Sequence, residues 1–202
     1  MRLRIMVAAM TLGACSLGAG SMRASAQTIT TDMPAKTAAG AMSPAKALDD
    51  MLSLYEHEAM GVVNAMPADK YSFAPSPAIF VPGQGVKFDT VRTFGQQVAH
   101  MAEANYYFYS TLSGLKPNVD MKKINAMTTK DDAVAALASS FEFAHKAIAT
   151  ITAANAFETI KGADGMHTRA TLAAFGVAHG YDHYGQLVEY LRMNGIVPPG
   201  SK

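Results

Sequence analysis

Two histidines, His179 and His183, stand four residues apart in a proline-free stretch that runs from Thr168 to Asn194 and ends before Gly195. At about 100° per residue, a helix places both on one apolar side. That side also carries Leu172, Phe175, Gln186, Tyr190 and Met193. Side chains four apart on a helix lie about 5–6 Å apart at Cβ, which allows two imidazole nitrogens to bind one metal ion. The spacing therefore indicates part of a helical metal site.

The same pair also has a simpler interpretation, as hydrogen-bonded core histidines. Two histidines at this spacing occur by chance in many helices. Burying a polar group without a partner costs roughly 2–7 kcal/mol, so each imidazole on a buried face needs a polar partner, either a metal or a neighbouring side chain. From this helix alone, a metal ion and a hydrogen-bonded core are about equally favoured.

Any metal bound by the mature chain must be held by nitrogen and oxygen. Cys15 is the single cysteine, and it lies in an N-terminal segment that we expect to be removed, which excludes disulfides and thiolate ligands. Asp182 and Gln186 neighbour the histidine pair, and either side chain is a candidate to orient a ligand histidine. For Asp182, a solvated surface role is the stronger expectation.

The N-terminus has the pattern of a secretory signal peptide. Residues 1–4 include two arginines, residues 5–20 are apolar or small, and Ala24-Ser25-Ala26 forms a cleavage motif. We expect residues 1–26 to be removed and the protein to be exported, either periplasmic or secreted. Leu12 to Cys15 also resembles a bacterial lipoprotein signal, in which case Cys15 would carry lipid and anchor the protein to the envelope membrane. Cleavage after Ala26 is favoured because the motif follows a full-length apolar run.

The mature chain is of a size for one domain. Removal of 26 residues from 202 leaves 176, and the loss of Arg2, Arg4 and Arg23 leaves 14 basic against 16 acidic residues. There is no basic excess and no dense Lys/Arg run, so we expect no nucleic-acid partner. Residues 27–42 are small, polar and aperiodic, which predicts a flexible linker before a domain at 43–202.

Helical periodicity dominates that domain. It predicts long helices at 43–65, from near Thr90 to Gly114, from 129 to about 152, and at 168–194. Residues 68–89 form a long connection with three prolines, and residues 153–167 are expected to be irregular with a short helical piece. No stretch shows convincing strand alternation. The fold class is therefore all-α, a four-helix bundle, and bundles build metal sites in the core from facing helices.

The remaining histidines carry weaker signals. His100 lies at the flank of the apolar face of the second helix, so periodicity alone does not select it as a ligand. Gln97, one turn before it, is a further candidate to orient a ligand. His57 has acidic neighbours and is expected at the surface, His145 at the edge of the core, and His167 in a polar loop.

Three segments together resemble the DinB-like proteins, the DinB/YfiT superfamily of bacterial four-helix metalloproteins. They are FGQQVAHMAEANYYFYSTLSG (Phe94–Gly114), HGYDHYGQLVEYLRMNGIVPP (His179–Pro199) and AMPADKYSFAPSP (Ala65–Pro77). The resemblance covers about residues 43–201. It implies an up-down-down-up bundle, frequent dimers and a divalent metal held by one histidine of the second helix and two of the last. At the matching positions of this chain those are His100, His179 and His183.

The resemblance also sets an expectation for function. Characterised relatives include thiol-dependent transferases and a mycothiol-dependent isomerase, but their thiol cofactors are cytoplasmic, whereas we expect this chain to be exported. Three imidazoles leave an open coordination position, and they suit zinc, nickel or iron, among other divalent ions. We expect an exported metal-dependent hydrolase or transferase that acts on a small molecule. The alternative is a non-catalytic envelope binding domain or lipoprotein, with a structural metal or none.

Overall fold

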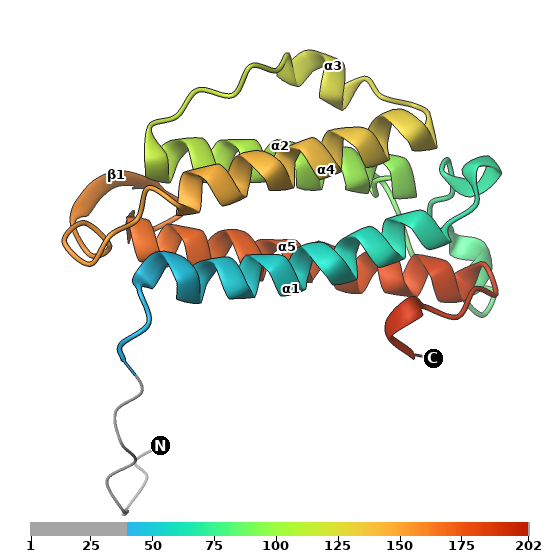
Figure 1. The fold of residues 1–202 in the computed structure, drawn as a ribbon. Helices are drawn as coiled ribbons and strands as arrows, with labels where there is room; N and C mark the ends of the chain where they lie inside the picture. The colour runs from blue at the N-terminus through green and yellow to red at the C-terminus, as the bar shows by residue number, and fades with distance from the viewer. Residues whose placement is uncertain (1–39, 202) are drawn as a thin grey trace, which may run out of the picture. The chain divides into compact units, whose positions relative to one another are not determined.

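The computed structural model describes residues 40–201, and its framework is a bundle of long helices (Figure 1). These are α1 (Pro44–Ala65), α2 (Phe94–Ser113), α4 (Lys130–Ile148) and α5 (Arg169–Met193). Helices α1 and α5 run in one direction, and α2 and α4 run in the other. Both α1 and α2 pack against α4 and α5, so α1 and α2 lie diagonally opposite each other. The predicted all-α four-helix bundle is confirmed, in the up-down-down-up order.

The predicted signal peptide at 1–26, with Cys15, lies outside the described residues, as does most of the predicted linker. Within residues 40–201, none of the helices combines the length and the apolar character needed to cross a bilayer.

Each long helix begins at a side-chain cap. The caps are Ser43, Thr93, Thr129 and Thr168. The predicted starts at 43, 129 and 168 are therefore correct. Helix α2 begins at Phe94 rather than near Thr90, because Thr90 has a φ of 70° and Thr93 forms a capping box with Gln96. Helix α4 ends at Ile148, earlier than the predicted end near residue 152.

The connection from α1 to α2 is ordered around two single-turn helices, η1 (Ala68–Lys70) and η2 (Pro77–Ile79). Its backbone is tied to the start of α2, because the Phe94 amide donates to the Phe73 carbonyl at 2.8 Å and the Gly95 amide to the Tyr71 carbonyl at 2.9 Å. The connection from α2 to α4 carries a short helix, α3 (Met121–Asn125), which packs on α2 (Figure 1). A last short helix, η3 (Pro199–Ser201), follows α5.

The join between α4 and α5 is a β-hairpin, so the predicted short helical piece is wrong. Strands β1 (Thr159–Ala163) and β2 (Met166–Thr168) pair antiparallel. The pair Ala163–Met166 encloses Asp164 and Gly165, whose φ values are 49° and 80°. Asp-Gly is the dipeptide that favours such a two-residue turn, because both positions need positive φ. That signal was present in the sequence, but the strands are too short to show alternation.

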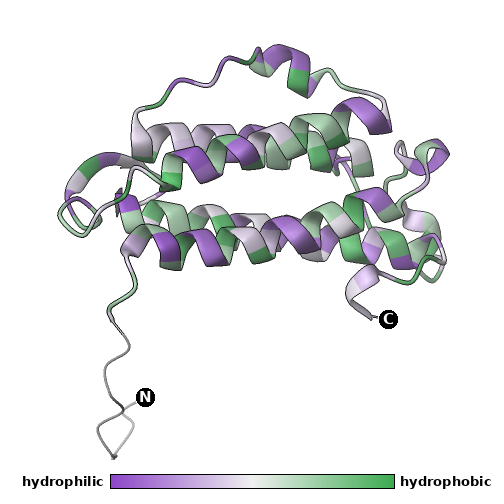
Figure 2. Cartoon of the chain, in the orientation of Figure 1, coloured by the Kyte–Doolittle hydropathy of each residue, from purple (hydrophilic) through white to green (hydrophobic). Residues whose placement is uncertain are grey.

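The core lies between the four helices, and each of these helices carries both hydrophilic and hydrophobic residues (Figure 2). The buried face of α5 is centred on Leu172, Gly176, Gly180, His183 and Leu187. Gln186 and Met193, predicted for that face, are exposed. The side of α5 that is buried is the one that carries Gly176 and Gly180, where the rings of Tyr109 and Tyr55 pack closely against the helix backbone.

Candidate metal centre

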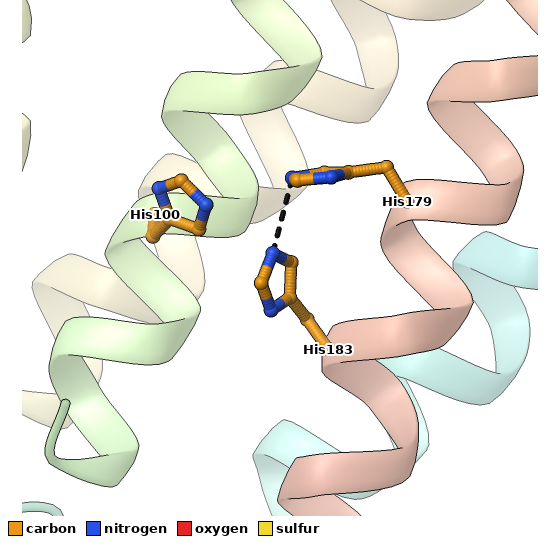
Figure 3. Close-up of side chains that lie close together, drawn as sticks. All are labelled: His100, His179 and His183. Carbon is orange, nitrogen blue, oxygen red and sulfur yellow. Dashed lines mark hydrogen bonds between the residues drawn. The ribbon is translucent and has the colours of Figure 1, made fainter. Parts of the chain in front are cut away.

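The bundle brings together the three histidines predicted as ligands. His100 comes from α2, and His179 and His183 come from the antiparallel helix α5 beside it (Figure 3). Each of the three offers one ring nitrogen, and these nitrogens all lie within 4.8 Å of one another. The rings of His100 and His183 have centroids 4.7 Å apart, and those of His179 and His183 are 4.5 Å apart. A flanking position on α2 is therefore sufficient for His100 to face α5.

The cluster fits a divalent ion with little adjustment. Metal–nitrogen bonds of about 2.0–2.1 Å place two ligand nitrogens no more than roughly 4.2 Å apart. The Nε2 atoms of His179 and His183 are 3.0 Å apart, joined by a hydrogen bond (Figure 3). A small rotation of side chains would complete the approach of the third nitrogen. Within residues 40–201 this is the one cluster of histidine and acidic side chains with such a geometry. The role of the three as metal ligands remains a prediction.

The electrostatic setting keeps the imidazoles neutral, which is the form that binds metal. Burial, helped by the neighbouring His179 and His100, lowers the pKa of His183 to about 4. The pKa values of His100 and His179 are also lowered, chiefly by burial. The positive charge of Arg92 acts in the same direction on all three.

Gln97 is the buried partner of the centre. Its side chain is only 2 % exposed, and its Nε2 amide lies 2.7 Å from Nδ1 of His183. The same amide nitrogen donates to Oε1 of Gln186, whose own Nε2 donates to Asp182 at 3.1 Å. Asp182 is exposed and its Oδ2 is 4.0 Å from Nδ1 of His183, so its hydrogen bonding reaches the histidine through this chain of amides, while its charge opposes the lowering of the His183 pKa.

A cavity of about 520 Å³ opens beside the cluster, with His100 and His179 in its wall. Most of the remaining wall is aromatic or aliphatic and includes Ala104, Tyr106, Tyr107, Phe108 and Met121. Its polar wall includes Glu103 of α2 and Asp164 of the hairpin turn. We refer to it as the apolar cavity.

A second cavity, of about 480 Å³, lies toward the start of α2 and shares His100 and Glu103 with the first. Its other lining residues include Arg92, Gln96 and Asn125, so we call it the polar cavity. Glu103 and Arg92 were not predicted as site residues. For Glu103 the signal was available, since it follows His100 by three residues and so lies on the same side of the helix. Arg92 lies outside the helix, where periodicity carries no information.

The other histidines lie away from the centre. His57 is exposed, as predicted, and His167 is exposed but lies in strand β2 rather than in the predicted loop. His145 is half-buried and lies between two acidic residues of α1: its Nδ1 is 2.6 Å from Asp49 and its Nε2 is 2.9 Å from Glu56. This ion pairing between α4 and α1 was not predicted.

Comparison with known proteins identifies the class. A helical bundle with a histidine cluster between its second and last long helices is the arrangement expected of a DinB-like protein. The DinB superfamily matches residues 51–187, and the chain belongs to that family. The matched region includes all three histidines.

A solved structure shows the same fold. The crystal structure of a DinB-like protein from Bacillus cereus is similar to this chain with a TM-score of 0.60 and 13% sequence identity. The similarity covers 78% of this chain and 97% of that protein. No functionally curated protein matches the chain.

Proposed function

We propose that this protein is a metal-dependent enzyme, a hydrolase or transferase that acts on a small molecule. The observation that carries the proposal is the convergence of three neutral imidazoles from two helices, two of which, His100 and His179, line an open cavity. A divalent ion held there would supply Lewis-acid chemistry to a bound substrate. Because three imidazoles fill only part of a coordination sphere, the site leaves room for that substrate.

Glu103 supports a catalytic rather than a purely structural site. Its carboxylate lines both cavities, its Oε1 accepts a hydrogen bond from Asn125 at 3.1 Å, and its Oε2 lies 3.8 Å from Nδ1 of His100. Oε2 is thus held beside the histidine cluster, where it can accept a proton from an attacking water or thiol. Asn125 belongs to α3, so the connection that packs on α2 also orients this carboxylate.

Metal analysis of the purified protein is the first test. We expect about one zinc, nickel or iron ion per chain, which His179→Ala removes. His57→Ala is the matched control, because His57 is exposed on α1 and lies outside the cluster. A protein without stoichiometric metal, or one whose metal content is unchanged in His179→Ala, would contradict the proposal.

An activity screen separates an enzyme from a binding domain. Esters, amides and thiol acceptors are offered to the metal-loaded protein, and we expect turnover that a chelator abolishes and that Glu103→Gln lowers about 100-fold or more. Turnover that persists in the chelator would contradict metal catalysis. A protein that retains its metal and turns over none of these compounds would favour the alternative, a non-catalytic envelope binding domain.

We also propose that the protein acts outside the cytoplasm, on the basis of the pattern in residues 1–26. The N-terminal residue of the mature protein is expected to be Gln27. Labelling with a fatty acid that is lost in Cys15→Ala would instead show a lipid-anchored envelope protein.

A further inference from the structure

The two cavities beside the histidine cluster differ in chemistry. Both are bounded by His100 and Glu103, so these two side chains mark the border between them. On one side of the border the wall is dominated by Tyr106, Phe108 and Met121. On the other side it includes Arg92, Gln96 and Asn125. A ligand that reaches into both cavities therefore meets an apolar surface at one end and hydrogen-bond donors at the other.

Arg92 is the cation of the polar cavity. The backbone of Arg92 is fixed because its carbonyl accepts a hydrogen bond from the hydroxyl of Tyr190 at 3.1 Å. Within residues 40–201 its guanidinium makes no ion pair, although Glu103 lines the same cavity. A guanidinium presents a planar set of donors that matches a carboxylate, so its natural occupant is a small anion.

The apolar end is defined by side chains on the other side of His100. Ala104 follows His100 by one helical turn, and its small side chain leaves room there. Tyr107 is 53 % exposed and Phe108 packs edge-on against the His179 ring, with centroids 5.3 Å apart. Aromatic walls of this kind gain most from contact with another ring or an alkyl chain.

We propose that this site takes an amphipathic carboxylate. Its charged end would bind Arg92, its aromatic or alkyl end would lie in the apolar cavity, and the bond between the two ends would face the histidine cluster. The inference rests on the proposed metal-dependent function, because it takes the histidine cluster as the reacting centre. It goes further by naming the substrate class: small molecules such as N-acylated amino acids.

Binding of three related probes to the metal-loaded protein tests the proposal by calorimetry. Hippurate has a phenyl ring, a central amide and a carboxylate. N-acetylglycine lacks the ring, and hippuramide lacks the charge. We expect hippurate to bind about ten-fold more tightly than either, because each of the others loses one of the two end contacts.

Two variants test which part of the site binds each end of the ligand. Arg92→Gln should weaken hippurate about ten-fold and leave hippuramide unchanged, whereas Lys146→Gln, which removes an exposed cation from α4, should change neither. Ala104→Trp should fill the apolar cavity and weaken hippurate and hippuramide but not N-acetylglycine. If Ala104→Trp fails to fold, Tyr107→Ala at a half-exposed position is the replacement, and it should weaken the same two probes.

Equal binding of hippurate and hippuramide would overturn the proposal. So would a preference for the acid that survives in Arg92→Gln, since the carboxylate would then bind elsewhere, for instance to the metal itself. Metal content is measured separately, and it tests the proposed metal-dependent function independently of ligand binding. If no metal is present, the probes are compared on the metal-free protein, where the loss of acid preference in Arg92→Gln still supports the ligand class and its persistence rejects it.

Discussion

At the scale of single residues, metal binding by the histidine cluster depends on which ring nitrogen of His183 carries the proton. With the Gln97 amide donating to Nδ1, the proton of the neutral ring is on Nε2, which faces His179. Binding a metal through Nε2 requires the proton on Nδ1 instead, with the Gln97 oxygen turned to accept it. The Gln186 amide must then turn as well and give up Asp182, which costs little because Asp182 faces solvent. Gln97 is thus the residue that fixes the tautomer of His183.

Replacing Gln97 by Leu should weaken metal binding about 10- to 100-fold, the usual effect of losing the partner of a ligand histidine. The reason is that Nδ1–H of His183 would be buried without an acceptor. Titration of the metal-free protein with zinc against a chromophoric chelator measures the affinity. Gln186→Leu, at an exposed position, is the control and should have a smaller effect. Equal affinities for wild type and Gln97→Leu would mean that His183 needs no such partner.

At the scale of the helices, two glycines of α5 set how closely it approaches its neighbours. A Cβ at Gly180 would lie 2.2 Å from Cζ of Tyr55, and one at Gly176 would lie 3.0 Å from the hydroxyl oxygen of Tyr109. Both tyrosine rings are fully buried. Tyr109 and His100 both lie on α2, so the close approach of α2 to α5 at Gly176 also favours the approach of His100 to His179 and His183.

Gly180→Ala should destabilise the protein by about 1–3 kcal/mol or more, because the added methyl overlaps the fully buried ring of Tyr55. Gly185→Ala is the matched control on the same helix, since a Cβ there meets no atom within 4 Å. That change should be neutral or stabilise by about 0.5–1 kcal/mol, because Ala favours the helix over Gly. Denaturant unfolding measures the free energy of unfolding of the two variants and of the wild type. Similar stabilities would show that Tyr55 is free to move aside.

At the scale of the whole molecule, histidines of opposite character shape the dependence of stability on pH. Burial alone lowers the pKa of His145, but its hydrogen bonds to Asp49 and Glu56 and their charges raise it overall. Only the imidazolium can donate from both ring nitrogens at once. A raised folded pKa stabilises the protein fully below the unfolded value of about 6.5, and the contribution is lost as pH rises above it. The three histidines of the cluster have lowered pKa values in the folded protein, so they have the opposite effect: they reduce the stability of the protein as pH falls below 6.5.

His145→Gln should therefore destabilise the protein more at pH 5.5 than at pH 8.5, since only the lower pH populates the imidazolium that joins α4 to α1. Because the three side chains are partly exposed, solvent screening keeps the difference small, about 1 kcal/mol or less. Urea unfolding of wild type and variant at the two pH values measures it. A constant difference across that range would show that His145 is not charged in the folded state.

Removing the metal should lower the stability of the whole bundle. An ion that binds only the folded state stabilises it by about 2.7 kcal/mol at a free concentration 100 times its dissociation constant. Thermal unfolding with and without chelator should therefore shift in the wild type and not in His179→Ala. An identical shift in His179→Ala would place the bound ion elsewhere.

Much of this protein follows from local sequence. The apolar periodicity predicts the helix starts at residues 43, 129 and 168 and the all-α class, because helix formation depends on neighbours within a few residues. Ser43 and Thr129 have the side chains expected of caps, and the structure adds Thr168 as a third. The spacing of His179 and His183 likewise requires only that α5 be a helix. The short hairpin was the exception, because strands of three to five residues are too short for a periodic signal. Its Asp-Gly dipeptide nevertheless indicates a two-residue turn.

Tertiary structure decided what depends on the approach of distant segments. His100 faces α5 from the flank of α2, Gln97 reaches His183 across 86 positions of the chain, and Arg92 reaches the border of the site from outside any helix. None of these contacts has a period or a spacing within one helix. They depend on how the helices pack against one another. Part of that packing lies at the glycines of α5 that admit the rings of Tyr55 and Tyr109, and a missing side chain leaves no hydrophobic signal in a sequence.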